Sequence, residues 1–263
     1  MKERQVEALV LKKEPFQEAD LLVTLLSREG ELLRVLAKGA RRPKSSLLAA
    51  VQPFVGGRYL LWPSRSLPGI RQARAEKSRS SLRLQPLPMA VASYGVEATL
   101  AFSVEGSPSP ELYRLLESFL DLTEAHREAP FPEWEVFLLA FEDALLTATG
   151  YGPGLEECPA CGKPLSGDSY RFRPLEGAVF HEGCSRGEGL SLAGEALGAL
   201  RLLAKPRSLP MAFRVQLSPR AREEAGRVLE AHLLGILGKP LKSRRALYLW
   251  KGGEAHGSRV GHL

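Results

Sequence analysis

The sequence predicts an α+β multi-domain protein in which an N-terminal five-stranded OB-fold barrel precedes an α-helical bundle that carries a small zinc-binding module. Three observations predict this class. Short strand-like apolar runs fill the first 80 residues, helical spacing of apolar residues follows, and all three cysteines lie within 27 residues of one another. The 263 residues, 44% hydrophobic and 25% charged, have a globular composition and suffice for more than one domain.

The barrel is predicted over residues 1–80, where turn residues separate five short apolar runs. These runs cover residues 6–11, 21–26, 32–37, 54–62 and 70–75. Glu29-Gly30-Glu31 is the turn between the second and the third run. Five strands of this length are typical of an OB-fold, and an SH3-like barrel would give the same pattern.

Helical spacing begins after Pro86, and Ser109-Pro110-Glu111 is a helix start signal with a capping Ser, a Pro and an early acid. Helices are predicted over residues 89–103, from residue 110 onward, and over residues 133–149, 191–203 and 218–237. The helical domain then has a first part, 81–150, and a second part, 191–250, around a zinc-binding module at 151–190. Residues 251–263 are polar and Gly-rich and are predicted to form a flexible tail.

The net charge of +6 is distributed unevenly along the chain. Residues 1–83 contain 17 basic and 8 acidic side chains, residues 84–150 contain 2 and 11, and residues 151–263 contain 17 and 11. The stretch from Leu32 to Ala75 contains nine Lys or Arg and no acidic residue. Because such asymmetry is typical of nucleic-acid contact, we expect the barrel to face a polyanion.

The cysteines form the pattern Cys158-Pro-Ala-Cys161 and His181-Glu-Gly-Cys184, which is typical of a zinc ribbon or knuckle. The sequence predicts one structural Zn²⁺ bound by Cys158, Cys161, His181 and Cys184, and four protein ligands leave no open position for catalysis. Alternatives are a redox dithiol, buried thiols that act as small hydrophobes, and a site in which His181 is a bystander. A redox motif opens a helix, whereas Gly162-Lys-Pro164 follows here.

A basic loop, Lys38–Ser46, follows the third run, and five cations lie within the 11 residues from Arg34 to Lys44. Lys and Arg bind phosphates in a salt-dependent and sequence-independent way, although such a loop also serves solubility alone. The predicted DNA-binding residues are Arg34, Lys38, Arg41, Arg42, Lys44, Arg58, Arg65, Arg71 and Arg74.

Two further groups are candidates for nucleic-acid contact. Phe54, Tyr59 and Trp62 are possible stacking platforms for unpaired bases, although aromatics at strand spacing are more often core. A possible second basic site follows the last predicted helix. It comprises Lys239, Lys242, Arg244 and Arg245, which equally suit the negative end of a helix dipole.

No P-loop, dinucleotide glycine fingerprint, nucleophile elbow or His-rich motif is found, so no enzymatic activity is expected. Glu142-Asp143 and Glu156-Glu157 are acidic pairs for a metal-dependent nuclease, a weaker alternative because sequence neighbours diverge in space. An RNA-binding protein associated with the ribosome or tRNA is another alternative. With no run of roughly 18 apolar residues and no hydrophobic signal core after Met1, we expect a cytoplasmic protein without a membrane span.

Three stretches of the chain resemble the bacterial RecO family of DNA-repair proteins. They are residues 18–54, residues 149–155 before the cysteine motif, and residues 238–244. The resemblance implies an OB-fold, a helical bundle with an embedded zinc-binding module, and a non-enzymatic protein of the cytoplasm and nucleoid. The basic barrel positions of the family fall here on Lys38, Arg41, Arg42 and Lys44.

The same resemblance implies a role in the RecFOR pathway of recombination and DNA-damage repair. RecO-like proteins bind single- and double-stranded DNA, anneal complementary strands, and work with RecR to help RecA displace the single-strand-binding protein SSB. The family usually has a Cys where this chain has His181, and some relatives lack cysteines, so zinc stabilises the fold rather than doing chemistry. A contact with the SSB C-terminal tail is implied through apolar and cationic groups of the helical lobe or of Lys242–Arg245.

Overall fold

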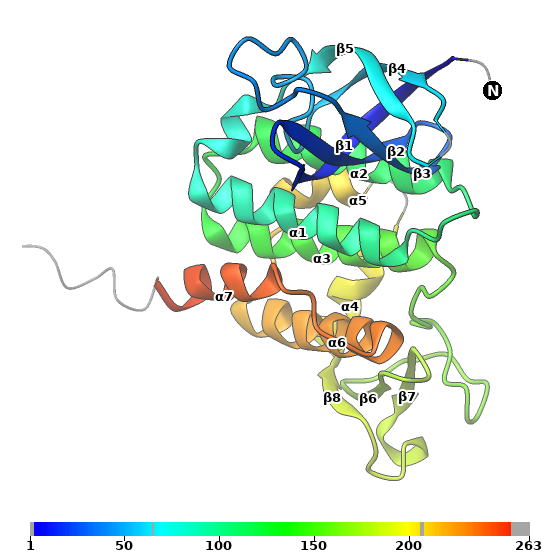
Figure 1. Cartoon of the computed structure of the whole chain (residues 1–263). Coiled ribbons are helices and arrows are strands. Elements are labelled where there is room, and N and C mark those ends of the chain that lie inside the picture. Colours follow the sequence, from blue (N-terminus) through cyan, green and yellow to red (C-terminus); the bar gives the residue numbers. More distant parts are fainter. Residues whose placement is uncertain (1–2, 65, 206–207, 254–263) are drawn as a thin grey trace, which may run out of the picture. The chain divides into compact units, whose positions relative to one another are not determined.

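A computed structural model describes residues 3–64, 66–205 and 208–253 of the chain (Figure 1). The chain forms two compact units, residues 1–127 and residues 128–263. The first unit contains the barrel together with two helices, so its boundary lies beyond residue 80. The finer division into a barrel, two helical parts and a module stays a prediction. The predicted tail lies outside the described residues except for 251–253, which belong to the last helix and not to a flexible tail.

The first unit opens with a closed five-stranded barrel, which confirms the predicted OB-like fold. Its strands are β1 (Arg4–Phe16), β2 (Asp20–Ser27), β3 (Leu32–Ala37), β4 (Gly56–Trp62) and β5 (Gly69–Lys77). The strands follow one another around the barrel in the order β1, β2, β3, β5, β4, and β4 pairs with β1. A parallel contact between Leu36 of β3 and Gly69 of β5 completes the ring, while the other pairs are antiparallel.

Alternating side chains of the strands form the barrel core. On β4, Tyr59 and Leu61 point inward and are buried, whereas Arg58 and Trp62 are exposed. The Tyr59 hydroxyl donates a hydrogen bond to the carbonyl oxygen of Ala50 at 2.8 Å. Phe54 is buried as well. Phe54 and Tyr59 therefore have no free ring face, and their prediction as stacking platforms was wrong.

Two helices, α1 (Pro86–Phe102) and α2 (Pro110–Ala125), complete the first unit after a short 3₁₀ turn at Ser80–Arg83. They pack closely because Gly95 of α1 faces the ring of Phe119, where a Cβ atom would lie 2.2 Å from the ring. Larger residues at position 95 would separate the two helices.

A buried arginine joins the barrel to α2. The side chain of Arg79 is 1% exposed, and its Nη1 donates to the carbonyl oxygen of Phe54 at 2.7 Å. Its Nε and Nη2 donate to one carboxylate oxygen of Asp121 at 2.8 and 2.5 Å. Arg79 itself has a left-handed backbone conformation with φ of 40°. Because a buried cation needs a partner, Asp121 is the residue on which this link depends.

Replacing Asp121 by Asn should lower the free energy of unfolding by about 2 kcal/mol, because the buried Arg79 loses its counter-ion. The Asp121 side chain is 41% exposed, so the change in its own solvation contributes little to this loss. The matched control is Glu117→Gln, which removes only the exposed ion pair with Lys77 and should cost about 0.5 kcal/mol or less. Urea unfolding followed by circular dichroism measures both variants. Equal losses in the two would contradict the role of Asp121.

The second unit combines helices with a small three-stranded sheet (Figure 1). Its helices are α3 (Phe131–Ala148), α4 (Gly194–Leu203), α5 (Ser208–Met211), α6 (Pro219–Leu237) and α7 (Arg244–Gly253), with 3₁₀ turns at Glu182–Cys184 and Ala212–Arg214. Its strands are β6 (Ser169–Arg173), β7 (Ala178–His181) and β8 (Leu190–Ala193), in the order β7, β6, β8.

The prediction that a helix begins at Ser191 was wrong. Residues 190–193 form β8, in which Ala193 pairs with Ser169 and Leu192 with Tyr170. The alternation of Leu190-Ser-Leu192 suits a strand, and α4 begins only at Gly194. The apolar residues that continue into α4 hide this boundary in the sequence.

His232 of α6 connects that helix to the segments around the sheet. The ring is 4% exposed and lies between two carbonyl oxygens, with Nδ1 2.7 Å from that of Pro174 and Nε2 2.8 Å from that of Tyr151. Gly177 passes so close to the ring that a Cβ atom would lie 2.7 Å from it. His232 therefore helps to position the sheet relative to α6, together with hydrogen bonds that Glu224 and Arg227 of α6 form with β8.

Candidate nucleic-acid interface and metal site

The three cysteines and His181 converge on one point. Their ligand atoms, three Sγ and one ring nitrogen, all lie within 4.8 Å of one another. The amides of Cys161 and Gly162 both donate to the carbonyl oxygen of Cys158, in a turn for which Gly162 adopts φ of +67°. His181 ends β7, and the following 3₁₀ turn carries Cys184. The two predicted ligand pairs are thus brought together by a turn and by the end of a strand.

The orientation of His181 suits metal binding. Nδ1 lies 3.4 Å from Sγ of Cys161, and Nε2 lies 3.2 Å from the carbonyl oxygen of Pro164. A proton on Nε2 can be donated to that carbonyl, which leaves the Nδ1 lone pair directed at the thiols. Histidine ligands in metal sites are commonly fixed by such a bond from their other nitrogen.

The thiols differ in how readily they lose their protons. Burial raises the pKa of Cys158, but amide donors, chiefly the backbone N–H of His181, outweigh burial and the pKa is lowered overall. The pKa of Cys184 is raised, first by its hydrogen bond with Cys161 and then by burial. Three sulfur atoms and one imidazole nitrogen form a donor set that fits a divalent cation such as zinc.

No comparable acidic cluster exists among the described residues. Glu142 and Asp143 are both 2% exposed in α3, and Glu142 accepts a hydrogen bond from Nη1 of Arg244 at 2.6 Å. Burial raises the pKa of Asp143 to about 6. Glu156 is exposed and lies 3.6 Å from Nε of Arg201. These pairs therefore give no site for the metal ions of a nuclease in the described part of the chain.

The predicted DNA-binding side chains of the barrel are exposed, apart from Arg65, which lies outside the described residues. The exposed set is Arg34, Lys38, Arg41, Arg42, Lys44, Arg58, Arg71 and Arg74. The loop that carries several of them is a series of turns held at its start, where the amide of Gly39 donates to Asp20 at 2.7 Å and Arg41 donates to the carbonyl oxygen of Glu18 at 3.0 Å. The cationic tips thus project from an anchored backbone.

The loop and the outer face of β4 and β5 share one depression, which we call the barrel hollow. Its volume is about 430 Å³. It is lined by Gln5, Ser46, Arg58, Leu60, Arg71, Gln72, Ala73 and Arg74. Arg58 and Arg74 lie opposite each other on neighbouring strands, and Ser46 brings the loop to the same place. Arg34 instead pairs with Thr24 on β2 and does not line the hollow.

The four residues of the second predicted basic site differ in exposure, and three of them are exposed while Arg244 is not. Lys239, Lys242 and Arg245 are exposed. The Arg244 side chain is 16% exposed and forms ion pairs with Glu142 at 2.6 Å and with Glu230 at 3.3 Å. Arg244 therefore stabilises the second unit, and its geometry argues against a phosphate contact.

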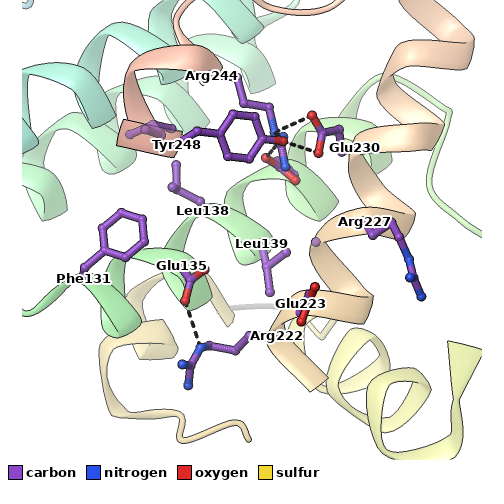
Figure 2. A pocket seen from close by; sticks show the side chains of 13 residues that line it. Phe131, Glu135, Leu138, Leu139, Arg222, Glu223, Arg227, Glu230, Arg244 and Tyr248 are labelled. Carbon is purple, nitrogen blue, oxygen red and sulfur yellow. Dashed lines mark hydrogen bonds and ion pairs between the residues drawn. The ribbon is translucent and has the colours of Figure 1, made fainter. Parts of the chain in front are cut away.

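Figure 2 shows a pocket among α3, α6 and α7, which we call the helical pocket. Its volume is about 280 Å³. Phe131, Leu138 and Leu139 form an apolar wall, and the side chains of Arg222 and Arg227 lie on α6 (Figure 2). α7 was not predicted as a helix, because the apolar run Ala246-Leu-Tyr-Leu-Trp250 is too short to distinguish a helix from a strand.

The fold and the sites define a class of protein: a basic OB-like barrel followed by a helical unit with a Cys₃His cluster. Residues 1–88 match the family described as "Recombination protein O N terminal", and residues 83–245 match "Recombination protein O C terminal". The chain belongs to the RecO family of DNA repair proteins.

Curated relatives agree with this assignment over most of the chain. The DNA repair protein RecO of Symbiobacterium thermophilum is 33% identical over 246 residues, which cover 92% of this chain and 95% of the relative. That of Desulforudis audaxviator is 38% identical over 186 residues, 70% of this chain and 71% of the relative. That of Geobacter metallireducens is 30% identical over 244 residues, 92% and 96% respectively. Across the described residues, every helix is too short or too polar to cross a membrane.

Proposed function

We propose that this chain is a non-catalytic recombination mediator that binds single- and double-stranded DNA and anneals complementary strands. With RecR, it assists the loading of RecA onto SSB-coated DNA. The observation that carries this proposal is that the anchored basic loop reaches, through Ser46, the barrel hollow that Arg58, Arg71 and Arg74 line. Family membership supports a role in DNA repair.

Annealing requires strands that are held by their phosphates while the bases remain free to pair. Exposed Lys and Arg side chains on a fixed loop bind phosphates without reading the sequence, and they release counterions as they do so. The loop cations Lys38, Arg42 and Lys44 are of this kind. Such a surface raises the local concentration of two strands at low cost to base pairing.

The proposal includes one structural Zn²⁺ at Cys158, Cys161, His181 and Cys184. The donor set and the orientation of His181 support this metal. A bound ion would join the turn after Cys158 to the end of β7, and four protein ligands would complete its tetrahedral shell. Its part would be to stabilise the second unit.

Annealing of two complementary labelled strands by the purified chain, in the absence of nucleotide, tests the proposal directly. We expect faster annealing with the chain, and faster RecA assembly on SSB-coated DNA only when RecR is also present. If RNA competed for the chain as well as single-stranded DNA does, an RNA-associated function would be favoured instead. Cleavage of the strands with added magnesium would indicate a nuclease.

We also propose that the SSB C-terminal tail binds in the helical pocket. An acidic chain end with apolar side chains needs an apolar wall and nearby cations, and the pocket combines Leu138 and Leu139 with Arg227. Arg227 is an exposed residue at the edge of the pocket, and its Nη2 donates to the carbonyl oxygen of Ser191. The carboxylates of Glu135, Glu142, Glu223 and Glu230 also line the pocket. Arg222 and Arg244 form ion pairs with three of them, so Arg227 is the cation that an acidic ligand would contact.

Arg227→Ala should weaken the binding of an SSB tail peptide about tenfold, because one charge-assisted contact is lost. Arg220→Ala is the matched control, since Arg220 lies on the same helix, is exposed and does not line the pocket. Fluorescence anisotropy of a labelled peptide gives both affinities. Equal affinities for the two variants would place the tail elsewhere.

A further inference from the structure

One aromatic ring on the barrel remains uncovered. Trp62, the last residue of β4, is 52% exposed and points to the outer face of the barrel. Its partner across the strand pair is Gly69 of β5, which has no side chain to cover the indole. An exposed Trp is unusual on a surface, because a large apolar ring gains by burial against a partner.

A β-bulge brings a cation to this ring. Leu60 pairs with Gln72 but Leu61 pairs with Ile70, so Arg71 is the extra residue of β5. The bulge allows Arg71 and Gln72 both to be exposed, while Ile70 remains in the core. The Arg71 guanidinium carbon lies 5.4 Å from the Trp62 ring centroid. Bulges often turn a side chain toward a binding site in this way.

Arg71 also lines the barrel hollow, so the uncovered ring adjoins a surface with the arginines Arg58 and Arg74. Arg58 pairs with Glu76 at 3.0 Å, and Arg71 pairs with Glu3. All four of these side chains are about one third or more exposed. Exposed ion pairs are weak, so phosphates can replace the carboxylates. A ring next to such cations suits a nucleotide better than an apolar protein surface.

We propose that Trp62 and Arg71 form a stacking site for one unpaired nucleobase, with the neighbouring phosphates in the barrel hollow. Base faces are hidden in a duplex and available in a single strand, so this site selects single strands, whereas the loop does not discriminate. The inference rests on the proposed DNA-binding function and adds strand selectivity to it. A strand that leaves Trp62 would be free to enter a duplex.

Three ligands of equal length separate stacking from phosphate contact: oligothymidine, a duplex, and an abasic strand with the same backbone. Trp62→Ala should weaken oligothymidine binding roughly tenfold and leave binding of the duplex and the abasic strand unchanged. Trp62→Phe should retain most of the affinity, because a ring is still present. Both variants should unfold at the wild-type temperature, since the indole lies outside the core.

Fluorescence gives a second readout. Oligothymidine should quench the tryptophan emission of a Trp250→Phe variant, in which Trp62 and the fully buried Trp134 are the remaining tryptophans. Adding Trp62→Phe to that variant should remove much of the quenching. Unchanged oligothymidine affinity in Trp62→Ala, or an equal loss on the abasic strand, would overturn the stacking site. A wild-type chain that binds none of the three ligands would instead overturn the proposed DNA-binding function.

Discussion

Replacing Arg41, Arg42 and Lys44 together by Ala should weaken DNA binding about a hundredfold at low salt, whatever the sequence of the DNA. The three side chains are exposed on a loop that is anchored through Asp20. When a phosphate contact is lost, one counterion stays on the DNA instead of being released. The slope of log affinity against log salt should therefore become less steep by about 2 for single strands. A salt titration of binding to single- and double-stranded DNA measures both effects.

The control for this experiment is a second triple variant with the same change of net charge. Arg114, Arg186 and Arg220 are exposed and lie outside the basic loop and the barrel hollow. Their replacement by Ala should leave the salt slope almost unchanged and lower the affinity only slightly, through long-range attraction. If both variants lost the same affinity, the loop would act through net charge alone and not through local contacts.

The barrel and the Cys₃His cluster could be predicted because both depend largely on short-range patterns. Alternation with a period of two places Tyr59 inside and Arg58 outside, and this pattern is local to the strand. Two residues between Cys158 and Cys161 likewise form one turn, which Gly162 permits. The basic character of the barrel surface could also be predicted, because the stretch from Leu32 to Ala75 contains nine Lys or Arg and no acidic residue.

Features that depend on long-range contacts could not be predicted in the same way. The sequence around Arg244 shows only neighbouring cations, because its partner Glu142 lies 102 positions away. The bulge at Arg71 is hidden because Arg71 and Gln72 are both polar, so an inserted residue leaves no mark on the pattern. The helical pocket requires three helices, of which the sequence indicated two. Burial of Phe54, which precedes β4 and lies outside its alternation, could not be predicted from residue type alone.

Loss of the metal should unfold the sheet region of the second unit before it affects DNA binding. Cys158 is buried at the centre of the Cys₃His cluster, and Cys158→Ser removes a thiolate while nearly preserving the volume. We expect loss of stoichiometric zinc and a decrease of about 3 kcal/mol or more in the free energy of unfolding. Elemental analysis and thermal unfolding, with and without chelator, measure this.

The ligand role of His181 can be separated from general stability by two substitutions. His181→Cys should supply a fourth thiolate and keep one zinc per chain, because zinc accepts thiolate and imidazole ligands alike. His181→Ala should keep three donors and bind zinc about 10- to 100-fold more weakly. The hydrogen bond to Pro164 is lost in both variants, so it does not account for a difference between them. Equal zinc affinity in both would make His181 a bystander, and a wild-type chain without zinc, as stable as Cys158→Ser, would contradict a structural metal.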